Sequence, residues 1–211
     1  MSERREIIPP LRVLEAARST MGSIDLDPWS TPERNHVIQA AAYLEQGDLE
    51  SRIKQPWSTE PGKRVLLAIP SGLPLSRALA NRTLELWKGN QISQAVLWFG
   101  TSEILAACPW LWDYPVCIPF LRLAPCFWDD ELEETVRVSP GAWSPIIYLP
   151  PISRQPSGDP LRDGLDLRNG IARFHAATGV FGRIVLDRWN GEHRWLAAYQ
   201  SHTGRPFWPD P

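Results

Sequence analysis

The sequence predicts an α/β layer fold with a mostly parallel central sheet. Segments with a helical spacing of apolar residues alternate along the chain with short apolar runs that are typical of strands. The runs at 65–68 and 94–99 are almost entirely apolar, which is typical of strands covered on both faces. A chain of 211 residues fits one domain and can bury a full core without metals or disulfides.

The first elements are predicted from their boundary residues. A helix over 10–19 and a short strand over 23–27 open the chain, separated by a glycine that stops the helix. Pro28 ends this strand. Thr31 is a hydroxyl cap, followed by a proline and a glutamate, and predicts a second helix that runs to about Tyr43.

The middle of the chain alternates between strands and helices. The polar stretch 50–63 contains two prolines and is expected to be a loop. We expect strands over 65–68, 94–99, 116–123 and 144–149, and helices over 75–88 and 101–107.

The last quarter is predicted as a linker, a helix and a hairpin. Residues 153–164 are rich in proline, glycine and aspartate, which favours an exposed linker. A helix is expected over 165–177, and Asn190-Gly191 is a strong hairpin signal between strands over 182–186 and 195–199. The expected organisation is a core over 1–152, the linker over 153–164, and a helix, hairpin and extended tail over 165–211 packed on that core.

Composition excludes several classes of function. A net charge of -2 gives no overall basic field, so a nucleic-acid partner would need a local patch. Cys108, Cys117 and Cys126 lack the close spacing of a zinc site, which predicts buried thiols in a reducing cytoplasm and no metal. No apolar run reaches the roughly 20 residues of a membrane span, so no membrane partner is expected.

The order of the motifs resembles a known family. Two prolines precede the first helix, an IDLDP turn follows it, and a Gly-Asp-Leu turn, a tryptophan and an apolar strand come later: Pro9-Pro10, Ile24–Pro28, Gly47–Leu49, Trp57 and 65–69. A later SPIIYL strand, Ser144–Leu149, fits the same order. This arrangement is similar to the phage-type DNA N6-adenine methyltransferases (Dam-like). The resemblance implies a Rossmann-like class I methyltransferase fold, S-adenosylmethionine as cofactor and DNA as partner.

The resemblance also implies a cofactor site built on acidic turns. Asp25, Asp27, Pro28 and Asp48 occupy the matching positions. Carboxylates at the carboxyl edge of a parallel sheet suit the ammonium and ribose hydroxyls of S-adenosylmethionine, and Asp27 is the better candidate because it lies next to the turn. The alternative for each aspartate is a turn or cap residue that accepts backbone hydrogen bonds.

The expected catalytic motif is degenerate. In the family an Asn-Pro-Pro-Tyr sequence orients the amine of a flipped adenine and stacks on its ring. Here the four positions are Ala68, Ile69, Pro70 and Ser71, so the amide acceptor and the aromatic ring are both missing. Losing one oriented electrostatic contact of this kind typically costs about 100- to 1000-fold in rate. The sequence therefore predicts a strongly impaired active site.

Three hypotheses follow from this mismatch. The first is a methyltransferase-like pseudoenzyme that binds S-adenosylmethionine, DNA or both. The second is an active methyltransferase that uses Ser71 and backbone carbonyls as replacement acceptors. The third is a protein-interaction or regulatory module without cofactor, which a pocket filled by side chains such as Trp29 or Trp57 would favour over the first.

Two charged segments remain. Arg183, Arg188, Arg194 and Trp189 form a candidate nucleic-acid surface, for which the alternative is a solvated hairpin. The acidic run 129–134 is expected to be a solvated loop rather than a magnesium site.

Overall fold

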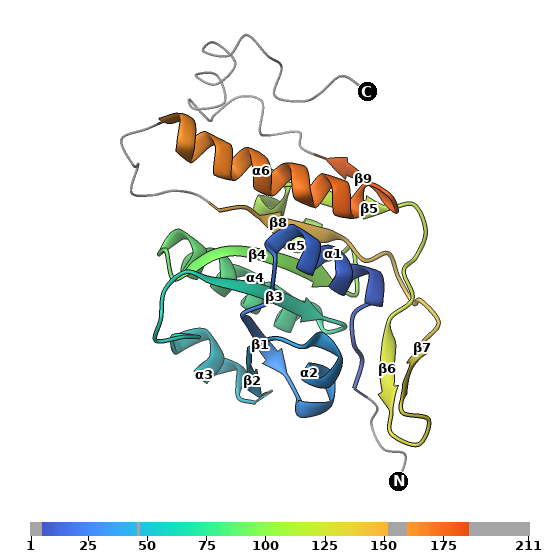
Figure 1. Cartoon of the computed structure of the whole chain (residues 1–211). Helices are drawn as coiled ribbons and strands as arrows, with labels where there is room; N and C mark the ends of the chain where they lie inside the picture. Colours follow the sequence, from blue (N-terminus) through green and yellow to red (C-terminus); the bar gives the residue numbers. More distant parts are fainter. Residues whose placement is uncertain (1–5, 46, 152–159, 186–211) are drawn as a thin grey trace.

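A seven-stranded mixed sheet forms the centre of the molecule (Figure 1). The computed structural model describes residues 6–45, 47–151 and 160–185. The sheet order is β2-β1-β3-β4-β8-β5-β9, with bounds β1 Leu26–Ser30, β2 Ala42–Glu45, β3 Lys63–Ile69, β4 Ile92–Phe99, β5 Val116–Pro119, β8 Ile146–Leu149 and β9 Gly182–Val185. Strands β2, β1, β3 and β4 are parallel to one another. β8 is antiparallel to β4 and β5, and β9 is antiparallel to β5. The predicted α/β class with a mostly parallel sheet core is confirmed.

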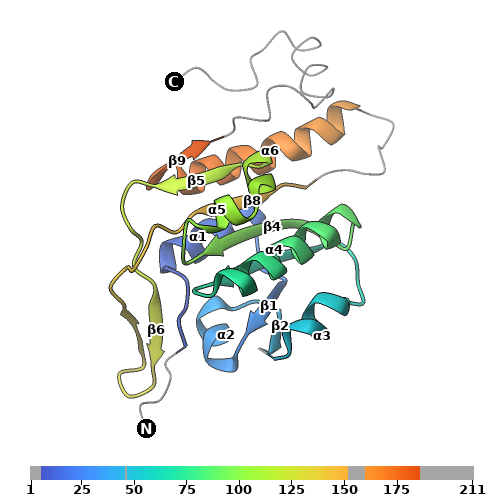
Figure 2. The ribbon, with the colours of Figure 1, turned by 180° about the vertical axis from the view of Figure 1, so that it is seen from behind.

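Helices cover both faces of this sheet. One face carries α3 (Leu49–Lys54), α4 (Leu73–Lys88), α5 (Ile104–Ala107) and the 3-10 helix η1 (Pro109–Asp113), as seen in Figure 2. The other face carries α1 (Leu11–Met21), α2 (Pro32–Ile38) and α6 (Pro160–Thr178), as seen in Figure 1. Because side chains alternate along each strand, β3 and β4 contribute apolar residues to both faces.

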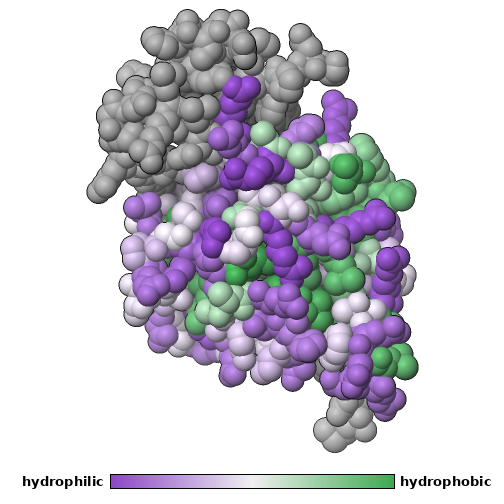
Figure 3. Space-filling view, in the orientation of Figure 1, coloured by the Kyte–Doolittle hydropathy of each residue, from purple (hydrophilic) through white to green (hydrophobic). Residues whose placement is uncertain are grey.

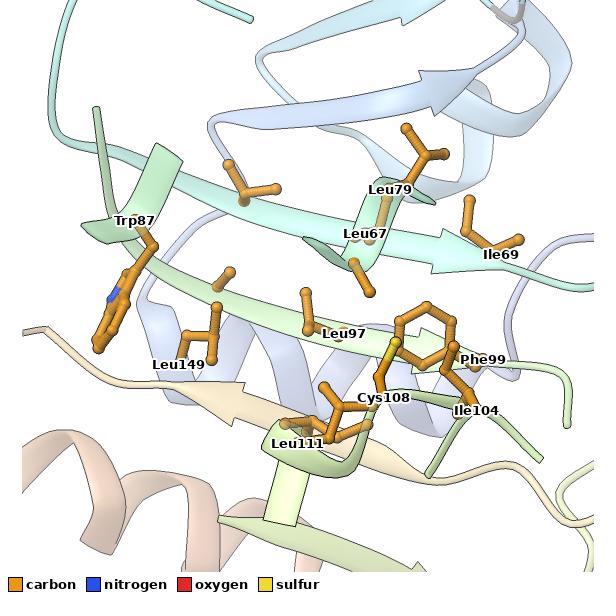
Figure 4. Packing of buried hydrophobic residues seen from close by; sticks show 14 of the residues in the cluster. Leu67, Ile69, Leu79, Trp87, Leu97, Phe99, Ile104, Cys108, Leu111 and Leu149 are labelled. Atoms are coloured by element: carbon orange, nitrogen blue, oxygen red, sulfur yellow. The ribbon is translucent and has the colours of Figure 1, made fainter. Parts of the chain in front are cut away.

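The core on the α4 face is built around the paired strands β3 and β4. Leu67 and Ile69 of β3 lie beside Leu97 and Phe99 of β4, and Leu79 of α4 packs over them (Figure 4). All five side chains are fully buried. The continuous apolar runs of the sequence therefore form the two central strands, as predicted.

The core on the opposite face includes the end of the described chain. Phe174 of α6 stacks on Tyr148 of β8 with ring centroids 5.3 Å apart, and the Tyr148 hydroxyl donates to Gln94 Oε1 at 2.6 Å. Arg173 Nε donates to the Thr20 carbonyl at the end of α1. Residues 160–185 are thus packed on the same sheet as the rest of the chain. The predicted linker over 153–164 is too long, because α6 already begins at Pro160. A proline is well suited to the first turn of a helix.

Two of the first elements differ from the prediction. The second helix ends at Ile38 rather than near Tyr43, because Gln39 adopts a left-handed conformation with φ 52° and the chain then enters β2. The first strand is shifted from 23–27 to Leu26–Ser30. An irregularity in its pairing with β2 accommodates Pro28, which has no N–H to donate.

A separate hairpin was not predicted. Strands β6 (Cys126–Asp129) and β7 (Glu134–Arg137) pair outside the main sheet, and the acidic run forms their turn, with Glu133 at φ 51°. Ile8 forms an antiparallel bridge with Cys126. The ring centroids of His36 in α2 and Trp128 in β6 lie 4.4 Å apart. The predicted strand over 116–123 is accordingly shorter, because β5 ends at Pro119 and the chain leaves the sheet toward this hairpin.

The three cysteines are buried and free, as predicted. Burial raises the pKa of Cys117 to about 12 and that of Cys126 to about 11. None of the helices in residues 6–45, 47–151 and 160–185 has both the length and the apolar character needed to cross a membrane.

Candidate functional site

The strand order identifies one position where open α/β sheets bind ligands. From β1 the chain passes to β2 on one side and then to β3 on the other side, so the winding reverses between β1 and β3. Ligands bind outside the carboxyl ends of the strands at such a switch point. Asp27 is the second residue of β1, and Ala68 lies near the carboxyl end of the neighbouring β3. Both lie near the side chain of Arg34.

Asp27 is completely buried. Its Oδ1 accepts a hydrogen bond from the Trp29 backbone N–H at 3.1 Å, whereas Oδ2 has no partner among the described residues. Burial raises the pKa of this carboxyl above its ordinary value, against the opposing effects of the Arg34 charge and of hydrogen bonds from Trp29 and Ser30. The predicted cofactor ligand has no exposed surface through which it could contact a ligand.

Arg34 fills the switch point and is the residue that sequence reasoning missed. Although it is charged, it is fully buried, and its Nη2 donates to the Ala68 carbonyl at 2.7 Å. It is held there by α2, whose first turn is capped by the Thr31 hydroxyl, which accepts from the Arg34 N–H. Arg34 and Ile38 are four residues apart and are the two buried residues of α2. That spacing, which places Arg34 on the apolar face of a short helix, was the available signal.

The degenerate motif itself makes internal contacts. The Ala68 carbonyl accepts from Arg34, and the Ile69 carbonyl accepts from the Gly100 N–H at 2.9 Å. Gly100 lies so close to Pro70 that a Cβ on it would come within 1.8 Å of the Pro70 oxygen. Ser71 is exposed in the turn before α4. The carbonyls that could orient an exocyclic amine are therefore already hydrogen-bonded or closely covered by protein.

The other two predicted aspartates lie elsewhere. Asp25 precedes β1 at the amino end of the strands, where it forms an ion pair with Arg64 at 2.7 Å and also accepts from the Arg64 backbone N–H at 3.0 Å. Partial burial raises its pKa, but the hydrogen bonds from Arg64 outweigh this effect and hold the pKa below its ordinary value. Asp48 is exposed and caps α3, since its carboxylate accepts from the N–H groups of Glu50 and Ser51. Asp48 therefore matches the cap alternative, whereas Asp25 joins two distant segments through its ion pair with Arg64.

The candidate nucleic-acid surface lies mostly outside the described residues. Arg183 is exposed on β9. Arg188, Trp189, Arg194 and the Asn190-Gly191 turn fall in the range 186–211, which the structure does not describe. The described ranges hold no group of three or more His, Cys, Asp or Glu side chains able to hold a metal ion.

The residues at the switch point do not fit S-adenosylmethionine. The cofactor carries an ammonium and a sulfonium, and the position beside Asp27 already contains the Arg34 guanidinium. A second cation there would be repelled and would have to displace a buried side chain. Searches among models of protein families and among characterised proteins give no match, so the likeness to the Dam-like methyltransferases is carried by the motif order alone.

Proposed function

We propose that this chain is a non-catalytic binding module on a methyltransferase-like α/β core that does not use S-adenosylmethionine. The observation that carries the proposal is the buried Arg34, which donates to the Ala68 carbonyl beside the buried Asp27. The side chain that fills the position is thus Arg34 rather than Trp29 or Trp57. A switch point filled by the protein itself favours the module without cofactor over a pseudoenzyme that retains it.

The chemistry of adenine methylation supports the loss of activity. The exocyclic amine needs oriented acceptors and the ring needs a stacking partner, and Ala68 and Ser71 supply neither. The backbone carbonyls of Ala68 and Ile69 accept internal hydrogen bonds instead. With about 100- to 1000-fold lost per missing contact, two losses leave a negligible rate even if substrate enters.

A methyl-transfer assay tests the proposal. Radiolabelled S-adenosylmethionine is incubated with the full chain and with single- or double-stranded DNA that contains adenine, beside an active Dam-like enzyme as positive control. We expect no transfer above the protein-free background. Robust labelling of the DNA would overturn the proposal. Loss of that labelling in Ser71→Ala would then assign the replacement role to Ser71.

A further inference from the structure

A cavity opens at the end of the sheet formed by β5 and β9. It measures about 570 Å³ and is lined by residues of both strands together with Trp143, which precedes β8: Ile118, Pro119, Phe120, Trp143, Arg183, Ile184 and Val185. Ile118 and Arg183 are cross-strand partners, so they project from the same face of the sheet. The volume lies within the range of small-molecule sites. No residue of the β1–β3 switch point lines this cavity.

Two aromatic side chains are exposed at the cavity. Phe120 is 63% exposed and Trp143 is 39% exposed. Figure 3 shows hydrophobic side chains gathered at the end of the molecule that carries β5 and β9. Exposed aromatic rings in an open cavity offer faces on which a flat ligand can stack.

The backbone holds these aromatic residues in place. The Phe120 N–H donates to the Phe181 carbonyl at 3.0 Å, which extends the β5–β9 pairing by one step. Gly182 permits the close approach of the strands, because a Cβ on it would come within 2.3 Å of Cys117 Sγ. On the other side, the Arg122 guanidinium donates to the Gly141 carbonyl at 3.5 Å and links the Phe120 loop to the Trp143 loop. These contacts hold together the strands and loops that line the cavity.

The cavity contains an arginine side chain and lies at the carboxyl edge of the sheet. Among the described residues that line the cavity, Arg183 alone is charged, and its guanidinium favours an anion. β5 runs in the same direction as β4, since both are antiparallel to β8. Phe120 follows β5 and thus lies at the carboxyl edge of the sheet, where open α/β folds place their ligands.

We propose that this cavity binds a nucleotide, with the base stacked on Phe120 or Trp143 and the phosphate paired with Arg183. A base has a flat ring that suits the aromatic faces, and its phosphate supplies the anion that a guanidinium recognises. The same chemistry comes either from a free nucleotide or from one residue of a single-stranded nucleic acid. This inference names a ligand class for the proposed binding module. It is argued from the cavity alone, so it does not depend on whether Arg34 closes the switch point.

Binding to the full chain tests this assignment. A fluorescein-labelled single-stranded dT or dA oligonucleotide is titrated by fluorescence anisotropy, and unlabelled AMP and dTMP are titrated by calorimetry. We expect Phe120→Ala or Trp143→Ala, whichever removes the ring that stacks on the base, to weaken binding about 5- to 150-fold. For the oligonucleotide, Arg183→Ala should reduce the salt dependence by about 0.7 in the slope of log K against log salt.

Matched controls keep the result interpretable. Leu132→Ala changes an exposed hydrophobic residue at the tip of the β6–β7 hairpin, and Arg12→Ala removes an exposed arginine on α1. Both should bind like the unmodified chain, and all variants should keep its unfolding midpoint because the replaced side chains are exposed.

Each outcome either identifies the source of the nucleotide or shows that the cavity is not a nucleotide site. Binding of AMP or dTMP supports a free nucleotide as ligand, and binding of the oligonucleotide alone supports a single strand. No binding of either, or binding that Phe120→Ala, Trp143→Ala and Arg183→Ala leave unchanged, overturns the inference and leaves a protein partner for this apolar surface. These results are distinguishable from failure of the proposed function, which is read from methyl transfer.

Discussion

Arg34 and Asp27 are oppositely charged side chains that are both fully buried, and Arg34 reaches the Ala68 carbonyl near the carboxyl end of β3. Replacing Arg34 by Met keeps much of the volume but leaves Asp27 without its compensating charge. We expect Arg34→Met to lower the free energy of unfolding by about 1–3 kcal/mol, because the buried Ala68 carbonyl loses the hydrogen bond from Arg34 and the buried Asp27 loses a nearby positive charge. Urea denaturation measures this loss, and Arg12→Met on the exposed surface of α1 is the control, expected within about 0.5 kcal/mol of the unmodified chain.

The pH dependence of Arg34→Met follows from the direction of the Asp27 shift. The pKa of Asp27 in the folded chain is raised above its ordinary value. The stability linked to this group is therefore complete below the unfolded pKa of about 4 and is lost as pH rises through the folded pKa. Removing Arg34 raises that pKa further, so the variant should lose more stability at neutral than at acidic pH. The double variant Asp27→Asn/Arg34→Met should recover part of the loss, and an equally unstable double variant would contradict the pairing.

Asp25 should show the opposite pH dependence. Its pKa is lowered in the folded chain, so its contribution is complete above the unfolded pKa of about 4 and disappears as pH falls through the folded pKa. We expect Asp25→Asn to lower the free energy of unfolding by about 1–3 kcal/mol at pH 7, because two hydrogen bonds from a charged group are weakened. The difference from the unmodified chain should shrink in denaturation experiments well below pH 4. A pH-independent difference would argue against the ion pair with Arg64.

The aspartates show what single residues can and cannot predict. The motif predicted Asp27 next to the turn that follows its strand, whereas β1 continues to Ser30 and Asp27 is its second residue. Asp25 directly precedes β1, and only the three-dimensional pairing of the strands brings Arg64 beside it. Arg34 escaped prediction because a charged residue near a capped helix start normally faces solvent. Its burial depends on Ala68, a contact across 34 positions of sequence.

At the scale of elements, the turn between β3 and α4 depends on a close approach by Gly100. A Cβ at this position would lie 1.8 Å from the Pro70 oxygen, so the turn that carries Ser71 would have to shift. We expect Gly100→Ala to lower the free energy of unfolding by about 1–3 kcal/mol, the range for overpacking a tight site. Gly141→Ala is the matched control, because a Cβ there meets no atom within 4 Å. Equal stability of the two variants, measured by urea denaturation, would show that the turn is not tightly packed.

The sequence predicted the buried elements better than the exposed ones. Strands β3 and β4 were recognisable because strands covered on both faces are almost wholly apolar. β2 was missed because the helix predicted from Thr31 was extended through Ala42 and Tyr43, and the left-handed Gln39 that ends α2 is not evident from the sequence. The β6–β7 hairpin was missed because each of its strands has four residues, which is too short to show a clear strand periodicity beside an acidic turn.

At the scale of the whole molecule, α6 and β9 complete one folded unit with the central sheet. Phe174 is fully buried against Tyr148, although the two residues belong to elements separated by the range 152–159. We expect Phe174→Ala to destabilise the whole chain by about 3–5 kcal/mol, as for other buried phenylalanines. Circular dichroism and tryptophan fluorescence should report one coincident transition. The control Val180→Ala, at an 81% exposed position, should be nearly silent, and an early separate transition in Phe174→Ala would contradict a single unit.

The central claim is that the protein's own side chains occupy the position expected for a cofactor. Calorimetric titration of S-adenosylmethionine into the purified full chain tests it most directly. Because the buried Arg34 and Asp27 close this position, we expect no saturable binding of S-adenosylmethionine. We expect the same result for S-adenosylhomocysteine, which lacks the sulfonium charge, because the position is closed to either molecule. Saturable one-to-one binding of S-adenosylmethionine that Arg34 variants alter would contradict the account.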